Sequence, residues 1–409
     1  MKKILVSAYG CEPNRGSEAG VGWNWVLQMA QNNELYVITR RNDKNKIEAN
    51  IPESISSNLH FVYYDTCELL KKVKNKEKGL YLYYWFWQIG IIQLIQKLCR
   101  ENDFDYCMHL SFGSLWMPTF LPFFKIPFIW GPLGGGDGVP KAFLKTLPLK
   151  QRIIQTFRYV LINTSFINPL VVFPSKKAKL ILCRTENNIM AIPKKYREKT
   201  KVILETAMET EVFLHKKNYI SPVNENINFI VTGRMVPFKN IKMAIEAFYR
   251  VTKILPNSKF TIIGKGPEQE KIEKYIKDKG IEDKVEILKQ MERTQVFKKL
   301  EEADIYVFPS LREGGSWSLM EAMAVGLPVV CFEWTGMDII TDKKTAIRIS
   351  PTNYENNVED FKNAMLELAL NYEKRYTMGI MARQRIKDEF LWDKKGEFFE
   401  LYLKELEGK

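Results

Sequence analysis

The chain has 409 residues, of which 45% are apolar, and it carries a formal net charge of +13. This length predicts two or three domains, and the apolar fraction is sufficient for packed cores. The six cysteines lie apart, without a Cys-x-x-Cys pair. We therefore expect reduced thiols in the cytoplasm, and the pattern excludes a disulfide framework and a cysteine-based zinc site.

The amino terminus predicts a strand at residues 2–9, a glycine-rich loop and an apolar helix at residues 23–30. Gly16, Ser17 and Gly20 in this loop let the backbone approach a phosphate or an acceptor closely. The glycine spacing differs from the dinucleotide fingerprint Gly-x-Gly-x-x-Gly. A plain connecting turn before a glycine-packed helix is the alternative. The apolar run is too short for a signal peptide, so we interpret it as a strand.

The surplus of positive charge lies in the first half of the chain. Residues 1–205 contain 29 Lys and Arg against 16 Asp and Glu, whereas residues 206–409 contain 32 of each. Lysines in residues 71–78 lead into an aromatic, apolar run at residues 79–95, a combination typical of membrane interfaces. Two glutamines interrupt that run, so it is not predicted to span a membrane. We expect an anionic membrane surface as a partner and no nucleic acid, because no nucleic-acid-binding module accompanies the charge. A buried helix beside a solvated lysine loop is the alternative.

The first half is predicted to be a doubly wound α/β domain, because short apolar strands alternate with helical patterns. The expected strands lie near residues 2–9, 34–39, 59–64, 105–111, 127–131, 170–173 and 202–203. The glycine-rich loop at residues 131–138 is expected to line the floor of a cleft. A polar stretch at residues 211–226 is the candidate linker, which gives a first domain of residues 1–210.

The second half repeats the alternation, with strands expected near residues 227–232, 259–263, 285–288, 304–308 and 328–332. The first of these strands leads into Gly233, Arg234 and Lys239. A planar guanidinium and an ammonium group, together with the positive end of the following helix, can neutralise a diphosphate. Two solvated basic side chains are the alternative reading.

Glu313 and Glu321 follow the strand at residues 304–308. A loop of glycine and serine carries the first, and a helix from about Ser316 to Val325 carries the second. Loops at the carboxyl edge of a parallel sheet are where α/β proteins bind ligands. Two carboxylates at different depths can each accept charge-assisted hydrogen bonds from vicinal hydroxyls, which the ribose and the sugar of a sugar nucleotide both offer. Solvated surface acids are the alternative.

The segment from Glu313 to Glu321 resembles the Glu-x7-Glu motif of retaining glycosyltransferases of family 4, and its continuation at residues 326–330 fits the same pattern. Residues 233–239 are similar to the family's Gly-Arg-x-x-x-x-Lys stretch, and the amino-terminal glycine loop is similar to that of a subset of the family. Residues 205–213 depart from the more usual Asn-Gly-Val-Asp of the family.

The resemblance covers nearly the whole chain and implies the GT-B fold, in which two Rossmann-like domains of doubly wound parallel sheets face a cleft. An acceptor-side domain at residues 1–210 would precede a nucleotide-sugar-binding domain at residues 211–390. A helix at residues 391–409 would cross back to the first domain.

The resemblance also assigns roles to individual residues. Catalytic roles fall to His109, Arg234, Lys239 and Glu313; donor binding to Glu321, Gly314, Gly315, Ser316, Trp317, Ser318 and Gly233; and the phosphate or acceptor loop to Gly16, Ser17 and Gly20. No metal is expected, because the lone Asp-x-Asp, Asp103 to Asp105, precedes a strand instead of ending one.

The expected function is metal-independent transfer, with retention of configuration, of a sugar from a nucleoside diphosphate sugar to a lipid-linked or polysaccharide acceptor in cell-surface glycan biosynthesis. No cofactor is expected beyond the donor. The expected location is the cytoplasm, peripheral on the inner face of the cell membrane. A sugar-nucleotide epimerase of the same fold, or a nonenzymatic nucleotide-sugar-binding subunit, are the alternatives.

Overall fold

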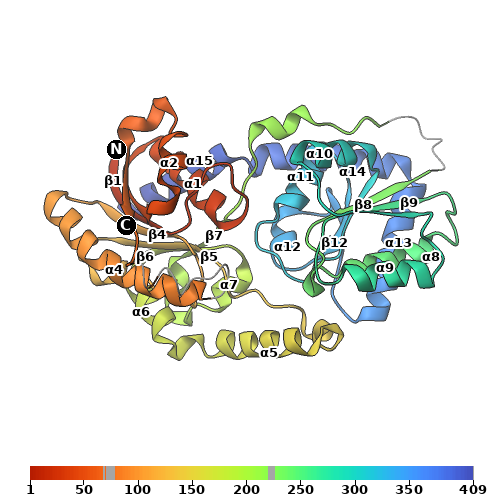
Figure 1. Ribbon diagram of the computed structural model, residues 1–409, viewed down its shortest axis with the longest axis horizontal. Helices are drawn as coiled ribbons and strands as arrows, with labels where there is room; N and C mark the ends of the chain where they lie inside the picture. The colour runs from red at the N-terminus through yellow and green to blue at the C-terminus, as the bar shows by residue number, and fades with distance from the viewer. Residues whose placement is uncertain (68–69, 71–78, 220–225, 409) are drawn as a thin grey trace. The chain divides into compact units, whose positions relative to one another are not determined.

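The computed structural model describes residues 1–67, 70, 79–219 and 226–408. The chain divides into two compact units (Figure 1). Unit 1 comprises residues 1–136, 161–205 and 392–409, and unit 2 comprises residues 137–160 and 206–391. Each unit is built around one parallel sheet, so the predicted α/β class is confirmed.

Unit 1 contains a seven-stranded parallel sheet with the order β3-β2-β1-β4-β5-β6-β7. The strands are β1 (Lys2–Ala8), β2 (Asn33–Arg40), β3 (Leu59–Tyr64), β4 (Tyr106–Ser111), β5 (Phe128–Leu133), β6 (Ala178–Cys183) and β7 (Thr200–Val202). The winding direction reverses between β1 and β4. In doubly wound sheets, ligands bind beyond the carboxyl ends of the strands at such a reversal.

The helices around this sheet are α1 (Ser17–Ala30), α2 (Lys44–Glu48), α4 (Leu80–Glu101), α6 (Pro169–Lys177), α7 (Glu186–Met190) and α15 (Trp392–Glu407). The buried face of α4 packs on the sheet through Trp87, Ile91 and Ile95, which share a core cluster with Leu5 and Trp130. Burial of such large side chains contributes most of the driving force for folding. Helix α15 packs against α1 through the rings of Phe399 and Trp25.

The strand predicted at residues 170–173 is wrong, because those residues lie in α6 and the next strand is β6. A short apolar run does not by itself distinguish a strand from a buried helix. The local signals for a helix were present: Pro169 occupies the first turn, and the side chain of Asn168 accepts a hydrogen bond from the Leu170 amide at 3.0 Å.

Unit 2 contains a six-stranded parallel sheet with the order β10-β9-β8-β11-β12-β13. The strands are β8 (Asn228–Thr232), β9 (Lys259–Ile263), β10 (Val285–Leu288), β11 (Ile305–Phe308), β12 (Val329–Phe332) and β13 (Ala346–Ile349). The first five lie where the sequence predicted them, and β13 was not predicted. The winding direction reverses between β8 and β11, which places the candidate ligand position there.

The helices of unit 2 are α8 (Ile241–Val251), α9 (Gln269–Asp278), α10 (Arg293–Glu302), α11 (Trp317–Val325), α12 (Gly336–Ile340), α13 (Tyr354–Leu370) and α14 (Tyr372–Glu389). Phe248 of α8 packs edge-on against Phe229 and Phe260 of the sheet. Lys217, which lies in the predicted polar stretch, is buried and pairs with Asp304 at 3.0 Å.

Residues 137–160 pack with unit 2 although they come early in the chain. Phe143 contacts Phe332 edge to face, with ring centroids 5.4 Å apart. The indole of Trp334 donates a hydrogen bond to the carbonyl of Gly138 at 2.9 Å. Most of helix α5 (Leu149–Asn163) belongs to this segment. Within the described part of the chain, no helix is long and apolar enough to cross a membrane.

Candidate active site

The winding reversal of unit 2 brings two predicted site residues together. Strand β8 leads into Gly233 and Lys239, and its neighbour β11 leads into Glu313. The Lys239 Nζ lies 2.6 Å from Glu313 Oε1, and both side chains are largely buried. The ammonium group also lies 5.0 Å from the ring centroid of Phe308. The structure therefore couples the cation predicted for a diphosphate with the carboxylate predicted for sugar hydroxyls.

The backbone of Glu313 is fixed from both sides by the loop that follows β12. Its amide donates a hydrogen bond to Thr335 Oγ1 at 3.2 Å, and its carbonyl accepts one from the Gly336 amide at 3.1 Å. A Cβ at Gly336 would lie 1.8 Å from the Gly314 carbonyl oxygen, so only glycine fits there. Thr335 adopts φ 52° and ψ −130°, a strained conformation for a β-branched residue. Strain of this kind persists where a site is held by its surroundings.

Arg234 differs from Lys239 in having no partner. Its side chain is exposed, and within the described ranges it forms no ion pair or side-chain hydrogen bond. The preceding Gly233 has φ +145°, and its amide donates to the Ile263 carbonyl at 2.9 Å. The guanidinium is thus a free fork of donors at the carboxyl end of β8, suited to an incoming anion.

Arg312 is a residue that sequence reasoning missed. Its guanidinium lies 4.8 Å from the ring centroid of Phe238, next to Lys239 in the chain. Burial lowers the pKa of Arg312 to about 10, and the neighbouring charge of Arg158 acts in the same direction. The stacking ties the Glu313 loop to the Lys239 loop. Its position beside Glu313 was visible in the sequence, but its partner Phe238 was not.

Glu321 lies in α11, beyond the loop that carries Glu313. Its Oε1 accepts a hydrogen bond from Arg293 Nε at 2.9 Å, and Arg293 also contacts Glu209 at 3.3 Å. Burial raises the pKa of Glu321, and Arg293 opposes that rise. The carboxylate is therefore a partly desolvated acceptor at the first turns of a helix. No spacing pattern predicted Arg293, which begins α10.

Residues 314–318 form the turn and the first positions of α11. A Cβ at Gly315 would lie 1.8 Å from Thr206 Oγ1, so this glycine allows close packing. The Trp317 indole donates a hydrogen bond to the Ala207 carbonyl at 2.8 Å, and the hydroxyls of Ser316 and Ser318 lie 3.2 Å apart. The stretch that departs from the family pattern thus packs against the predicted donor-binding turn.

In unit 1, His109 lies in β4 with its side chain fully buried. Burial lowers its pKa to about 4, and a backbone hydrogen bond with Phe112 and the charge of Glu18 oppose that shift. The other two histidines both have carboxylate partners: His60 contacts Glu34 at 3.1 Å, and His215 contacts Glu301 at 2.8 Å. His109 is therefore neutral at pH 7. Unlike His60 and His215, it has no carboxylate partner among the described residues.

The amino-terminal glycine loop leads from β1 into α1. Gly16 is the N-cap of α1 and Ser17 its first residue, whereas Gly20 is buried one turn later. The carboxylate of Glu18 lies 3.2 Å from the Arg184 guanidinium and accepts a hydrogen bond from the Gly113 amide at 3.0 Å.

Arg184 of unit 1 also contacts a second acid, Glu205, at 3.3 Å. Burial alone would raise the pKa of Glu18, but Arg184 and the Gly113 amide lower it overall. This end of α1 therefore already holds a carboxylate. Arg184 was not predicted, because its two partners lie far from it in the chain.

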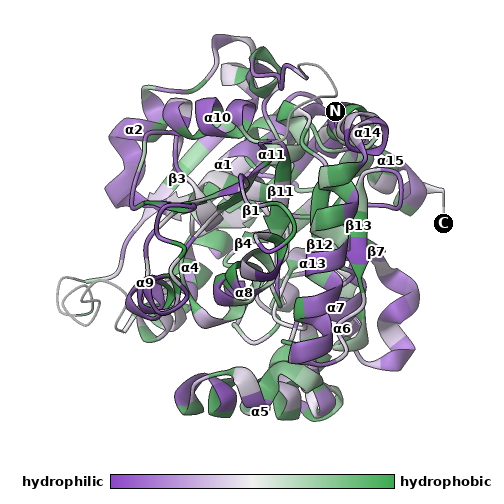
Figure 2. Cartoon of the chain, turned by 90° about the vertical axis from the view of Figure 1, so that its right-hand side faces the viewer, coloured by the Kyte–Doolittle hydropathy of each residue, from purple (hydrophilic) through white to green (hydrophobic). Residues whose placement is uncertain are grey.

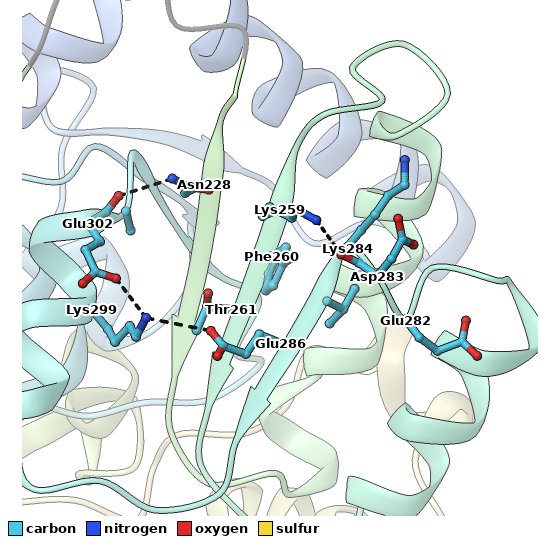
Figure 3. A pocket seen from close by; sticks show the side chains of 12 residues that line it. Asn228, Lys259, Phe260, Thr261, Glu282, Asp283, Lys284, Glu286, Lys299 and Glu302 are labelled. Atoms are coloured by element: carbon cyan, nitrogen blue, oxygen red, sulfur yellow. Dashed lines mark hydrogen bonds and ion pairs between the residues drawn. The ribbon is translucent and has the colours of Figure 1, made fainter.

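The opposite edge of the unit 2 sheet carries a groove whose charged side chains contact neighbouring residues of the groove (Figure 3). It lies at the amino ends of β8, β9 and β10. Lys299 contacts Glu302 at 2.9 Å and Glu286 at 4.0 Å, and Lys259 donates to the Asp283 carbonyl at 2.5 Å. Parallel sheets bind ligands at their carboxyl edge, so this groove is not the candidate site.

Asp103 and Asp105 form the Asp-x-Asp sequence of the chain, which was not predicted to bind a metal. The Asp105 carboxylate accepts a hydrogen bond from the Lys3 amide at 2.8 Å and contacts the Lys2 ammonium at 3.8 Å, a structural role at the start of the sheet. In the portion of the chain that the structure describes, no group of three or more His, Cys, Asp or Glu side chains is arranged to hold a metal ion.

Residues 215–385 match the model of the family glycosyl transferases group 1. The chain is 35% identical over 160 residues to poly(ribitol-phosphate) alpha-N-acetylglucosaminyltransferase of Staphylococcus aureus, covering 39% of the chain and 31% of the relative. It is 28% identical over 174 residues to the amylovoran biosynthesis glycosyltransferase AmsK of Erwinia amylovora, covering 41% and 42%. The matched segments span less than half the length of these curated relatives.

The structure of Anabaena HepE in complex with UDP is similar over 99% of this chain and 100% of that one, with a TM-score of 0.61 and 13% identity. The chain therefore has the two-unit α/β architecture of GT-B glycosyltransferases, as predicted. The segment that matches the family glycosyl transferases group 1, residues 215–385, lies within unit 2.

Proposed function

We propose that the protein is a retaining, metal-independent glycosyltransferase that moves a sugar from a nucleoside diphosphate sugar to a glycan or lipid-linked glycan acceptor. The Lys239–Glu313 pair at the winding reversal of unit 2, beside the unpartnered Arg234, carries this proposal. A site with two cations and one carboxylate suits a ligand that joins a diphosphate to a polyol. The names of the curated relatives above support a role in cell-surface glycan biosynthesis.

In the proposed reaction the bond between the anomeric carbon and the diphosphate breaks, and the acceptor oxygen attacks from the same face. The diphosphate gains negative charge as it leaves, and Arg234 and Lys239 offset that charge. Donors placed where charge develops are worth about 3 kcal/mol each. No described carboxylate is assigned as a nucleophile, and the leaving phosphate takes the proton of the acceptor hydroxyl.

Glu313 and Glu321 bind the two hydroxyl-bearing parts of the donor. Glu313, held by Thr335 and Gly336, accepts from the hydroxyls of the sugar. When the diphosphate attracts Lys239, the carboxylate of Glu313 is released from its ion pair and becomes available to the sugar. Glu321 accepts from the ribose hydroxyls, in exchange for part of its contact with Arg293.

His109 contributes a neutral imidazole in unit 1. A neutral ring has one donor and one acceptor nitrogen, which suits a hydroxyl group better than a phosphate. The ring has no carboxylate partner among the described residues, unlike the rings of His60 and His215. We assign it to a hydroxyl of the transferred sugar.

Incubation with a panel of nucleoside diphosphate sugars, with and without candidate acceptors, tests this function. Release of free nucleoside diphosphate that depends on Arg234 is the expected result. Conversion of the donor to its epimer without release would identify an epimerase, and tight donor binding without any turnover would identify a binding subunit. The anomeric configuration of the product, read by NMR, decides whether the transfer retains it. Turnover that persists in excess chelator supports independence from metal.

We further propose that the protein works in the cytoplasm, peripherally on the inner face of the cell membrane. The lysines at residues 71–78 lie outside the described residues. The helix that follows them is described, and α4 exposes apolar side chains along one side: Tyr81, Leu82, Trp85, Phe86 and Ile89. Aromatic residues of this kind favour the membrane interface. The names of the S. aureus and Erwinia relatives, which refer to poly(ribitol-phosphate) and to amylovoran biosynthesis, support a polymeric acceptor.

A further inference from the structure

Helix α5 presents an apolar stripe whose side chains are each more than half exposed. Leu149, Ile153, Phe157 and Val160 recur at intervals of four, four and three residues, which places them on one side of the helix. Their exposed fractions are 69, 60, 61 and 52%. The opposite side holds the buried Gln155. Hydrophilic and hydrophobic residues are interspersed along α5 (Figure 2). The usual arrangement of an amphipathic helix is inverted, because the polar Gln155 is buried and the large apolar side chains are exposed.

The charge around this stripe is of one sign. From Gly138 to Thr185 the sequence contains nine Lys and Arg and no Asp or Glu. Lys145, Lys150 and Arg152, at and just before the start of α5, are all exposed. Residues 138–185 therefore carry nine of the thirteen surplus positive charges of the first half of the chain.

We propose that α5 docks on an anionic lipid bilayer, with Leu149, Ile153, Phe157 and Val160 in the interface and the flanking lysine and arginine side chains on the lipid headgroups. Binding of this kind scales with the apolar area buried and with the attraction of basic residues to anionic lipid. The inference deepens the peripheral membrane association proposed above and rests on it. It adds a second contact surface, independent of α4.

Other occupants fit this surface less well. A second copy of α5 would bring two basic segments together, with no acidic side chain between residues 138 and 185 to compensate. A nucleic acid would use the basic residues but would leave four aliphatic and aromatic side chains of α5 exposed to water. A bilayer interface satisfies both features at once.

The test is flotation of the full-length protein with phosphatidylcholine vesicles that do or do not contain phosphatidylglycerol. We expect wild-type protein to bind the anionic vesicles and to bind the zwitterionic ones more weakly. Lys150→Glu combined with Arg152→Glu should weaken the partition coefficient at least about thirtyfold, because each basic residue is worth about fivefold. Ile153→Ser combined with Phe157→Ser should weaken it by about tenfold per residue.

Matched controls carry the same changes on surfaces outside α5. Lys274→Glu with Lys277→Glu on α9 repeats the charge change, and Leu214→Ser with Leu370→Ser repeats the apolar change at exposed positions. Both controls should bind vesicles nearly as wild type does. Circular dichroism confirms that each variant is folded.

The outcomes separate the two membrane surfaces. Loss of binding by Trp85→Ser with Phe86→Ser on α4, together with full binding by both α5 variants, would overturn the α5 proposal and leave the peripheral location standing. No binding by wild type would overturn both. Sedimentation velocity without lipid tests the alternative that α5 forms a dimer interface. A wild-type dimer that becomes a monomer when Ile153→Ser is combined with Phe157→Ser would show that a second copy covers α5. Glycosyl transfer is measured separately with soluble donor, so its failure does not affect this test.

Discussion

The carboxyl edges of the two sheets differ in how far their basic side chains are paired with carboxylates. In unit 2, Arg234 has no ion-pair partner among the described residues, and Lys239 pairs with one carboxylate, that of Glu313. In unit 1, Arg184 lies between two carboxylates, those of Glu18 and Glu205. The edge in unit 2 therefore retains positive charge for an anion, whereas the charge of Arg184 in unit 1 is balanced by its two carboxylates.

The group that unit 1 leaves available is neutral. His109 is fully buried, and burial keeps its pKa at about 4, so it carries no charge at pH 7. A neutral imidazole suits a hydroxyl, and a free guanidinium suits a phosphate. The comparison teaches that net charge is a poor guide to the anion site: residues 1–205 carry the whole surplus, yet the cations positioned for a diphosphate lie in the half whose charges balance.

The largest expected effect is on the two cations at the carboxyl edge of the unit 2 sheet, Arg234 and Lys239. Arg234→Ala and Lys239→Ala should each lower turnover about 10²- to 10³-fold and weaken donor binding far less, because the charge they face grows as the bond breaks. Initial rates of nucleoside diphosphate release, compared with calorimetry of donor binding, give the two quantities. Lys242→Ala is the matched control, because Lys242 is paired with Glu246 on α8 and should leave turnover unchanged. A loss of binding as large as the loss of turnover would contradict a transition-state role.

The second prediction concerns the neutral side of the comparison. Because the folded-state pKa of His109, about 4, lies below the unfolded value of about 6.5, the folded protein resists protonation. The stability from this group is complete above about pH 6.5 and is lost as the pH falls towards 4, by about 3 kcal/mol. Chemical denaturation from pH 7 to pH 4 measures it. His109→Leu should remove this part of the pH dependence.

The role of His109 in turnover is tested with two further variants. His109→Gln keeps a donor and an acceptor on the side chain, whereas His109→Ala removes both. We expect His109→Ala to lower turnover more than nucleotide affinity and His109→Gln to restore part of the rate. Turnover at the wild-type level in both variants would make His109 a structural residue only.

The strand-to-helix turns of unit 2 were predictable from the sequence, because each follows a short apolar strand and precedes a helix with a clear stop. Strands β8, β11 and β12 and helix α11 lie within a residue or two of their predicted positions. The contact between Lys239 and Glu313 follows from the pairing of β8 with β11, which a doubly wound order implies.

Other features depend on contacts between residues far apart in the chain. The run at residues 170–173 lacks a period that separates strand from helix, and α6 forms there because Asn168 and Pro169 begin it. Arg293 contacts Glu321, and Arg312 stacks on Phe238, across distances that no local pattern encodes. The exposed stripe of α5 has the helical period of a buried face, so only the structure reveals that it is uncovered.

A smaller effect is expected at Glu321, the partly buried carboxylate of the donor side. Glu321→Ala should weaken both donor and free nucleoside diphosphate about 10- to 100-fold, since a hydrogen bond to a charged group is worth about 1.5–3 kcal/mol. Turnover at saturating donor should change little. Burial raises the pKa of Glu321, so the carboxylate becomes protonated at a higher pH than an ordinary glutamate does. As the pH is lowered, wild-type affinity for the nucleotide should therefore begin to fall above the usual titration range of a glutamate. Calorimetry across that range checks both points, and a pH-independent affinity would place the ribose elsewhere.

The smallest effect on nucleotide affinity is expected at Glu313, and its sign is informative. Removing this carboxylate frees Lys239, so Glu313→Ala should bind free nucleoside diphosphate as tightly as wild type or more tightly. It should nevertheless discriminate among sugars about tenfold less well, because the charge-assisted bonds to the sugar hydroxyls are lost. Calorimetry with free nucleotide, beside competition between two donor sugars, measures both. If folded Glu313→Ala and Arg234→Ala both turn over at near wild-type rates, the carboxyl edge of unit 2 does not perform glycosyl transfer in the way proposed, and the difference between the two sheet edges has another cause.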